Sequence, residues 1–389
     1  MRRRRAGALV LWLPVLACVG ACADLGLGSP QLVAGGVRLY HLTDPSLLDT
    51  PGPIAIDLLR LDPARVELRS ALANDEVMGT EAVLDLSLRH GAAAAVNAGF
   101  FLPNGDPAGV MKIDGVLVSE AARTRGAVGV HAPAGRGPQA IVFDRLSVDV
   151  WIGFEAGDGP VTMTVDGVDT TRRRGALMLF TPRYHPDTDT ADGGTEWVVR
   201  GTPLTVSERR PPGVGRTPIP PDGAVLSFGG TTVPPPLDAL QVGHVITLTV
   251  GFHPQLGSST AAWSGARDIV GGAGLLRVGG RTLADWTEEQ LREGFTTERH
   301  PRTMIGVGST GEIWLVTVDG RQPGHSVGMT FAELQRLADR LDLRDALNLD
   351  GGGSTTMVVG DRIVNRPSDP EGPRKVSDAL LVFARGPRG

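Results

Sequence analysis

The chain has very little cysteine: Cys18 and Cys22 are its only two among 389 residues. Both lie near the N-terminus, so no disulfide can form within the rest of the chain. An exported domain of this size must then be stabilised by its hydrophobic core. The sequence also lacks a histidine pair at metal-ligand spacing, such as His-x-x-x-His. Zinc is therefore unsuited to this chain, and we expect no cofactor.

One acidic stretch leaves calcium open as an alternative. Asp187, Asp189 and Asp192 lie close together in the sequence, and carboxylate oxygens are the ligands that calcium prefers. The same residues are also typical of a solvated loop.

Long hydrophobic runs are missing as well. The apolar run from about Ala6 to Gly20 is shorter than the roughly 20 residues that a membrane-spanning helix needs. Four arginines precede the run and Val19-Gly20-Ala21-Cys22 follows it, which is typical of a bacterial signal peptide of the lipoprotein type over residues 1–21. Cys22 would then be lipidated and become the first mature residue, and the protein would be anchored in the cell envelope. Cleavage without lipidation, giving a periplasmic or secreted protein, is the alternative.

Positive charge is scarce once the signal peptide is removed. The formal net charge of −5 becomes −9, because residues 1–21 contain four arginines and no acidic residue. An acidic domain of this kind does not bind nucleic acid or anionic membranes through its bulk charge. We therefore expect no nucleic-acid partner, and contact with a membrane only through the lipid.

The composition and the local patterns favour strands over helices. With 53 glycines, 29 prolines and 5% aromatic residues, the chain suits a strand-and-loop enzyme with one large domain. Residues 22–36 form a tether of small residues, and residues 37–79 are predicted to contain three strands. The predicted strands are Val37–Tyr40, Ile54–Leu61 and Val66–Ala71. We expect an α+β fold with a mainly β-sheet core and a few packed helices.

Three helices are predicted. Thr80–His90 contains apolar residues and stops at Gly91, a common residue at a helix C-terminus. Thr287 with Gln290 has the spacing of a capping box, and so does Thr330 with Glu333. The last of these helices has an apolar stripe that would pack on a sheet and lead the chain into the next strand.

The segment Leu347–Met357 is the most informative part of the sequence. Asn348 and Asp350 alternate with leucines in a strand, and three glycines follow, so the backbone can approach a ligand closely. Ser354, Thr355 and the nearby N–H groups offer hydrogen-bond donors to an anion or a sugar. A tight turn with an Asx cap is the alternative reading of three glycines.

Several other segments accompany this motif in a fixed order. They are Val96–Phe101, a hairpin over Gly109–Gly115 that turns at Asp114-Gly115, His300–Gly306, Leu315–Arg321 and the tail segments Pro367–Asp369 and Pro373–Ser377. Together with Asn348–Ser354 they resemble the phosphodiester glycosidase domain family, from roughly Thr80 to Ala384. The corresponding domain would span residues 80–386. One departure is Ala98, where the family usually has glycine.

This resemblance also bears on the proline-rich stretch from Arg209 to Pro236. Prolines in such number are common at domain boundaries. The resemblance continues across the stretch, however, which indicates a loop region inside one domain.

The resemblance implies a substrate in which a sugar is joined through its anomeric carbon to a phosphodiester. A carboxylate would stabilise the reacting carbon, with Asp350 and Asp319 as candidates, and His325 could serve as an acid. Asp319-Gly320 could instead be a hairpin turn. The candidates for binding the phosphate and the sugar are Arg302, Arg321, Asn97, Asn348, Gly351, Gly352, Ser354 and Thr355.

The sequence thus predicts an exported hydrolase that acts on sugar phosphodiesters, such as N-acetylglucosamine-like units in a cell-envelope glycopolymer. A carbohydrate-binding or exopolysaccharide-assembly protein on the same fold is the main alternative. A glycosidase for ordinary glycosides is another, and it predicts cleavage that does not depend on phosphate.

Overall fold

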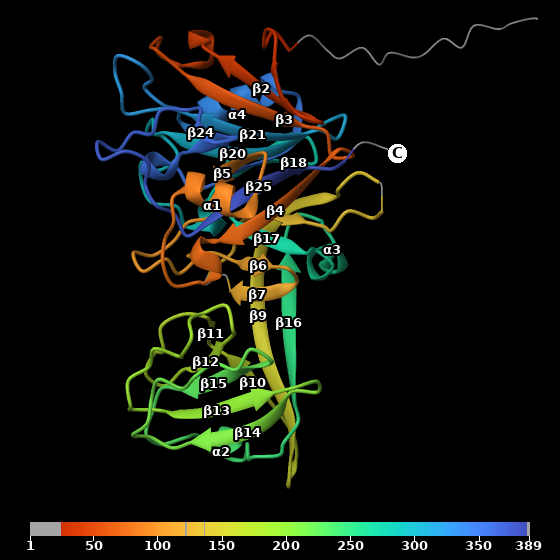
Figure 1. The fold of residues 1–389 in the computed structure, drawn as a ribbon, viewed down its shortest axis with the longest axis vertical. Coiled ribbons are helices and arrows are strands. Elements are labelled where there is room, and N and C mark those ends of the chain that lie inside the picture. The colour runs from red at the N-terminus through yellow and green to blue at the C-terminus, as the bar shows by residue number, and fades with distance from the viewer. Residues whose placement is uncertain (1–24, 121–122, 136, 387–389) are drawn as a thin grey trace, which may run out of the picture.

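The computed structural model describes residues 25–120, 123–135 and 137–386, which form a β-rich body with a smaller lobe attached (Figure 1). The predicted signal peptide and Cys22 lie outside the described residues. Within the described part of the chain, no helix is long and apolar enough to cross a membrane. Most of the regular structure is strand, which confirms the predicted α+β class with a mainly β-sheet core.

The largest sheet of the body has eight antiparallel strands and carries the glycine-rich loop at one strand end. In spatial order its strands are β1 (Gln31–Ala34), β2 (Val37–Leu42), β3 (Ile56–Leu61), β21 (Ile313–Val318), β20 (Arg302–Gly308), β22 (Leu343–Asn348), β18 (Leu275–Val278) and β19 (Arg281–Thr282). Strands β2 and β3 confirm the first two predicted strands. The predicted tether is corrected, because Gln31–Ala34 pairs with β2 and so belongs to the fold.

Helix α4 (Phe331–Arg340) covers one face of this sheet. Thr330 and Glu333 form both hydrogen bonds of the predicted capping box. The apolar stripe of the helix, which includes Phe331, Leu334 and Leu337, packs in a core cluster with β3, β20 and β21. The chain then passes directly into β22, as predicted.

A five-stranded antiparallel sheet faces the first one across the main core. Its strands, in spatial order, are β24 (Arg362–Ile363), β23 (Met357–Val359), β5 (Ala94–Asn97), β25 (Asp378–Ala384) and β4 (Val66–Leu72). Helix α1 (Val83–His90) packs on this sheet and ends, as predicted, at Gly91, which has a φ of 66°. The third predicted opening strand is β4.

A third sheet links the body to the lobe. It contains β10 (Gly159–Val165), β9 (Ile141–Ala156), β8 (Arg125–Val130), β17 (Asp268–Gly271), β6 (Met111–Ile113) and β7 (Val116–Ser119), with β16 (Ile246–Pro254) paired to β9. The predicted hairpin is β6–β7, and it turns at Asp114 and Gly115, both with positive φ. The short helix α3 (Thr260–Ser264) follows β16.

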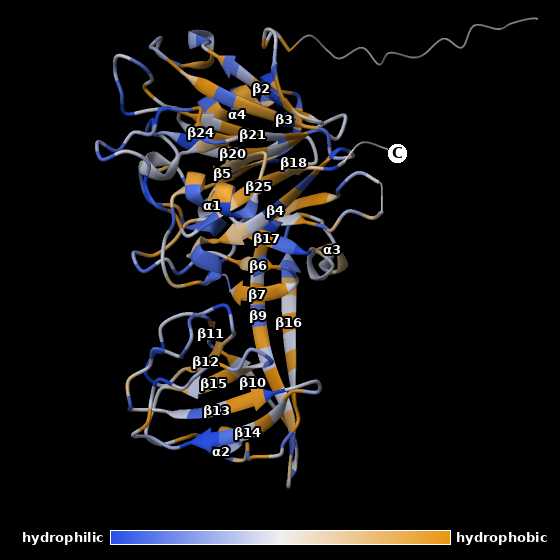
Figure 2. Cartoon of the chain, viewed as in Figure 1, coloured by the Kyte–Doolittle hydropathy of each residue, from blue (hydrophilic) through white to orange (hydrophobic). Residues whose placement is uncertain are grey.

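The lobe is built on the far ends of the long strands β9 and β16, which lie side by side (Figure 1). Its five-stranded sheet contains β11 (Gly167–Val168), β12 (Leu177–Phe180), β15 (Gly223–Phe228), β13 (Thr195–Arg200) and β14 (Thr205–Arg210), and the short helix α2 (Pro235–Asp238) follows β15. The proline-rich stretch lies within this lobe and contains the whole of β15, so the segment is part of a folded unit. Figure 2 shows hydrophobic colour along the strands and hydrophilic colour mainly in the connecting loops.

Four single turns of 3-10 helix complete the fold of the described residues: η1 (Pro45–Leu47), η2 (Ala73–Asp75), η3 (Thr287–Glu289) and η4 (Gly352–Ser354). The turn η3 stands where the helix opened by Thr287 was predicted, and that prediction is wrong. The Thr287 hydroxyl bonds to Asp285, and Gln290 adopts a left-handed conformation that ends the turn.

Candidate active site

The glycine-rich loop begins where β22 ends, and its glycines are required by close contacts. Leu347 and Leu349 are fully buried in the core, as the alternating pattern predicts. A Cβ on Gly351 would lie 2.6 Å from the Pro301 carbonyl oxygen. Gly352 has a φ of 62°, and a Cβ there would lie 3.0 Å from a guanidinium nitrogen of Arg321. The loop backbone therefore packs closely against the segment before β20, which a simple turn would not need to do.

Asp350 opens this loop and is partly exposed. Its Oδ1 accepts a hydrogen bond of 2.9 Å from the Gly351 N–H. Burial of the carboxyl group raises the pKa of Asp350 to about 6, and the nearby Asp378 carboxylate acts in the same direction against the opposing effects of Ser354, the Gly351 N–H and Arg374. A carboxylate of this pKa is ionised at neutral pH and can still accept a proton, as a general base must.

Asp378, at the start of β25, is the carboxylate behind Asp350. It is 0% exposed, accepts a 2.6 Å hydrogen bond from the Gly99 N–H and is bonded to the Ser377 hydroxyl. Burial raises the pKa of Asp378 to about 6. A fully buried side chain cannot touch a substrate, so Asp378 acts on Asp350 and on the Gly99 backbone. Sequence reasoning missed this residue, since a lone aspartate at a strand start carries no signal.

The cation beside the loop is Arg321. Its side chain is exposed, lies against Gly352 and is 3.3 Å from His300 Nδ1. Arg321 makes no ion pair with a carboxylate among the described residues. Burial and the charges of Arg302 and Arg321 lower the pKa of His300, so its ring is neutral at neutral pH. The predicted role of Arg321 as a phosphate ligand fits this placement.

Arg302 does not fit its predicted role. It is 2% exposed, its Nε donates to the Met329 carbonyl, and its Nη2 donates to the carbonyls of Phe295 and Glu298. The guanidinium also stacks on Phe295 and Phe331. We correct the prediction: Arg302 fixes the segment that precedes it.

Asn97 is likewise a positioning residue and is 0% exposed. Its Nδ2 donates to the Asp350 carbonyl at 2.7 Å, and its Oδ1 accepts from the Thr303 hydroxyl and the Thr356 N–H. The prediction that Asn97 contacts a sugar is therefore wrong. Asn97 instead holds the Asp350 backbone in place. Next to it, the Ala98 carbonyl accepts the Asp350 N–H at 2.9 Å, and Ala98 has no positive φ, which explains why alanine is tolerated there.

Asn348, Ser354 and Thr355 are all buried beneath the loop. Asn348 donates to the carbonyls of Ala273 and Leu349, while its Oδ1 has no partner among the described residues. Ser354 lies near the Asp350 carboxylate, although its hydroxyl makes no hydrogen bond of ordinary geometry in the described structure. Their side chains are enclosed by the protein, so the predicted contact with the substrate is corrected to support of the loop from within the core.

Asp319 and His325 form a separate pair. Asp319 is 2% exposed, and its oxygens accept hydrogen bonds from His325 Nε2 at 2.7 Å, Asn365 Nδ2 and the Arg366 N–H. Among the described residues neither Asp319 nor His325 makes a hydrogen bond or ion pair to Asp350. The hairpin-turn alternative for Asp319 does not apply, because Asp319 anchors the segment at Asn365. The catalytic role predicted for Asp319 and His325 stays a prediction.

Two of the three acidic residues considered for calcium pair with a cation of the chain itself. Arg216 makes ion pairs with Asp187 and Asp189, at 3.2 and 3.0 Å. Among the described residues no group of three or more acidic, histidine or cysteine side chains is arranged to hold a metal ion.

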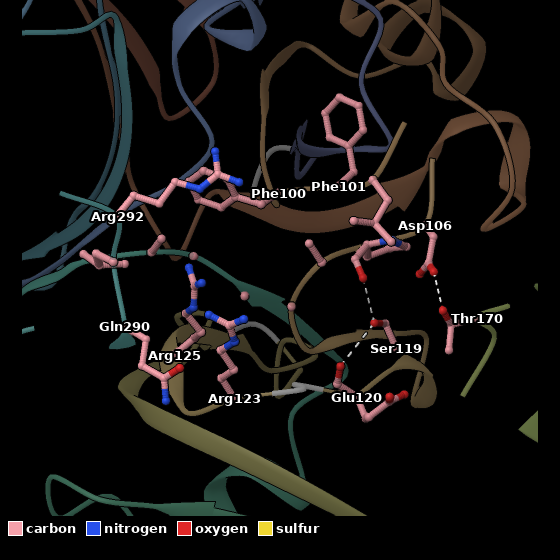
Figure 3. A pocket seen from close by; sticks show the side chains of 18 of the residues that line it. Phe100, Phe101, Asp106, Ser119, Glu120, Arg123, Arg125, Thr170, Gln290 and Arg292 are labelled. Carbon is pink, nitrogen blue, oxygen red and sulfur yellow. Dashed lines mark hydrogen bonds between the residues drawn. The ribbon is translucent and has the colours of Figure 1, made fainter. Parts of the chain in front are cut away.

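A cavity of about 660 Å³ is lined by Phe100, which follows the Ala98–Gly99 segment bonded to Asp350 and Asp378 (Figure 3). One wall is formed by Phe100, Phe101 and Phe295, and another by the backbone of Gly271–Ala273. The remaining lining is mostly polar. It includes Arg123, Arg125, Arg173, Arg292, Asp106, Ser119, Glu120 and Gln290.

The positive and negative side chains lie in different parts of the cavity. Figure 3 shows Arg123, Arg125 and Arg292 gathered on one side, with Asp106 and Glu120 on the other. Burial raises the pKa of Asp106 to about 6 and also raises that of Glu120. Sequence reasoning missed these arginines because they come from separate segments with no shared motif.

Comparisons with known proteins agree with the family resemblance. The family model described as phosphodiester glycosidase matches residues 193–383, which is the C-terminal part of the segment that carried the resemblance. The chain is 33% identical over 87 residues to the bovine N-acetylglucosamine-1-phosphodiester alpha-N-acetylglucosaminidase, covering 21% of this chain and 16% of the bovine protein. The chain thus spans a small part of that relative's length.

Two solved structures share the fold over most of the chain. A hypothetical protein from Synechocystis has a TM-score of 0.74 and 26% identity, covering 90% of this chain and 62% of its own. A Burkholderia pseudomallei protein described as exported has a TM-score of 0.71 and 24% identity, covering 86% of this chain and 75% of its own. Over residues 193–383, just under half of its length, the chain matches the phosphodiester glycosidase family.

Proposed function

We propose that the protein is an exported glycosidase that hydrolyses the bond between a sugar's anomeric carbon and a phosphodiester. The observation that carries this proposal is that Asp350 and Arg321 both lie at the glycine-rich loop. A carboxylate with a pKa of about 6 opens the glycine-rich loop, and a guanidinium without a carboxylate partner among the described residues lies against Gly352. One group suits the reacting carbon and the other suits the phosphate.

The reaction needs few groups from the protein. The bond between the anomeric carbon and the phosphate oxygen breaks, and its electron pair leaves with the phosphate. Asp350 either takes the proton from the attacking water or attacks the carbon itself, after which water releases the sugar. Arg321 offsets the charge of the departing phosphate. The products are a free sugar and a phosphomonoester.

The buried residues around Asp350 support this chemistry by fixing its position. Asn97 holds the Asp350 carbonyl, and Ala98 holds its N–H. The backbone is thus bonded on both sides, which keeps the carboxylate oriented before substrate arrives. Burial, with a smaller contribution from the Asp378 carboxylate, raises the pKa of Asp350, so the carboxylate is a stronger base than an ordinary aspartate.

The proposed location is the cell envelope. The signal peptide over residues 1–21 and lipidation at Cys22 rest on the sequence pattern alone. The natural substrate would then be a phosphate-containing glycopolymer, with N-acetylglucosamine-like units as the leading candidate. Cell fractionation tests the anchor, because Cys22→Ala should move the protein from the membrane fraction to the soluble fraction.

The test is sugar release by the purified protein from a synthetic N-acetylglucosamine-α-1-phosphodiester and from a matched α-glycoside without phosphate. Release from the phosphodiester alone, lost in Asp350→Asn but not in Asp361→Asn, is the expected result. Asp361 is the control because it is exposed and makes no ion pair among the described residues. Equal release from both compounds would indicate an ordinary glycosidase. Binding without release would indicate the carbohydrate-binding alternative.

A further inference from the structure

We propose that the arginine-lined cavity beside Asp350 binds a second anionic group of the substrate, the phosphodiester of the neighbouring repeat. The natural substrate would then be a chain of sugar phosphodiesters and not an isolated unit. This inference rests on the proposed function and names the class of substrate for that site. It extends the site to residues that the glycine-rich loop does not contain.

The cavity and the Asp350 loop share a wall. Phe100 lines the cavity and follows Gly99, whose N–H is bonded to Asp378. Ala98, one residue earlier, is bonded to the Asp350 N–H. A ligand in the cavity therefore lies against the same short segment that positions the catalytic carboxylate.

A second part of the cavity wall makes the same connection. A Cβ on Gly272 would lie 2.5 Å from the Asn348 carbonyl oxygen, and the Ala273 carbonyl accepts the Asn348 side chain at 2.8 Å. Both Gly272 and Ala273 line the cavity. The end of β22, which leads into Asp350, is thus packed directly behind the cavity wall.

The arginines of the cavity are available to a ligand. Arg123, Arg125 and Arg292 make no ion pair and no side-chain hydrogen bond to any of the described residues. Burial lowers the pKa of Arg125, and the neighbouring charge of Arg123 adds to this effect against the opposing effect of Glu289. Like charges held together without a counter-ion favour binding of an anion, and guanidinium groups match phosphate oxygens in paired hydrogen bonds.

Glu289, whose charge acts on Arg125, does not neutralise these arginines. Glu289 is 0% exposed and already accepts hydrogen bonds from Arg145 and from the N–H groups of Gly126, Gly274 and Leu275. The Glu289 carboxylate is therefore already bonded by other groups of the protein. The positive side of the cavity remains without a matching carboxylate.

The rest of the cavity lining suits a sugar. Asp106, bonded to the Thr170 hydroxyl at 2.6 Å, and Glu120 provide oxygens that can accept hydrogen bonds from sugar hydroxyls. Phe100 and Phe295 lie with ring centroids 6.0 Å apart and offer an apolar surface for a sugar ring. A volume of about 660 Å³ holds a ligand larger than a single phosphate.

The experiment measures binding to the full chain by calorimetry, in the Asp350→Asn background so that ligands stay intact. The probes are a methyl diester of N-acetylglucosamine-α-1-phosphate, a tandem compound with two such phosphodiesters, and the uncharged disaccharide. We expect the tandem compound to bind at least tenfold more tightly than the single diester, as one additional charge-assisted contact would give. The uncharged disaccharide should bind most weakly of the three.

Substitution then tests the arginines. Arg125→Gln and Arg292→Gln should each reduce the tandem-to-single affinity ratio several-fold, and the double variant should bring it close to one. The matched control is Arg281→Gln, an exposed arginine outside the cavity, which should keep the ratio. Arg292 is exposed, so its variant is informative even if the half-buried Arg125 variant folds poorly.

A ratio near one in the starting protein, or a ratio that the arginine variants do not change, would overturn the inference. The proposed function is judged separately, by turnover of the single diester in the wild-type protein. Turnover with no preference for the tandem compound would refute the second anion site alone. Arginine-dependent tandem binding without turnover of either compound would refute the proposed function and leave the anion site standing.

Discussion

Replacing Asp378 by asparagine should make the protein more stable at neutral pH and leave it almost unchanged near pH 4. The carboxyl group is 0% exposed, and its pKa is raised from 3.8 to about 6 by burial. In the unfolded chain the same group titrates near 3.8. Between these two values the folded protein therefore holds a proton that the unfolded chain has lost, and stability falls as the pH rises through this window.

The size of the effect follows from the shift. A difference of about 2 pKa units corresponds to about 3 kcal/mol once both states are fully ionised. At about pH 4 the native Asp378 is protonated and resembles asparagine in shape and charge, so the two proteins should differ little. At about pH 8 the variant should be more stable by about 2–3 kcal/mol, because it carries no buried charge. The amide oxygen that the Asp378→Asn substitution introduces can still accept the Gly99 N–H.

Urea unfolding at pH 4, 5, 6, 7 and 8 measures this difference, with Asp361→Asn as the control for loss of an exposed charge. The same Asp378→Asn variant should move the acidic limb of the pH–rate profile to lower pH, because Asp378 helps to raise the pKa of Asp350. A purely structural role would not shift that limb. A stability difference that is constant from pH 4 to pH 8 would refute the reasoning.

Three further results are expected. Asp350→Asn should lower kcat by at least about 10²-fold with the melting temperature retained, which steady-state kinetics and calorimetry would measure; normal turnover would remove Asp350 from catalysis. Arg302→Ala should lower the free energy of unfolding by about 3 kcal/mol, since three backbone carbonyls lose their donor, and a change in phosphate affinity without loss of stability would contradict this. Gly272→Ala should destabilise the protein and distort the site, because its Cβ would lie 2.5 Å from the Asn348 carbonyl oxygen; unchanged urea unfolding would show that the wall can move.

The sequence predicted those structural elements that depend on residues close together in the chain. The capping box at Thr330 and Glu333, the helix end at Gly91 and the turn at Asp114-Gly115 all depend on residues close together in the chain. The helix predicted at Thr287 did not form, because the Thr287 hydroxyl bonds to Asp285 and makes no capping box with Gln290. Spacing alone does not distinguish the two.

The candidate site was predicted only where the motif itself carries the chemistry. The loop at Asp350 could be read from the sequence, since its glycines and carboxylate are adjacent. Whether a polar side chain faces a ligand or the protein depends on distant segments, and this is why Arg302 and Asn97 were assigned to the substrate although both are bonded internally. The partner of Asp350, Asp378, comes from a strand 28 positions later and could not be found by pattern.

The central claim is that the protein breaks the bond between the anomeric carbon and oxygen and leaves the phosphorus–oxygen bond intact. Hydrolysis of the synthetic N-acetylglucosamine-α-1-phosphodiester in ¹⁸O-labelled water tests this most directly, with mass spectrometry of both products at early times. We predict that the label enters the sugar and that the phosphomonoester stays unlabelled. Label in the phosphomonoester would show attack at phosphorus, and the account of Asp350 as the residue that acts at the anomeric carbon would then be wrong.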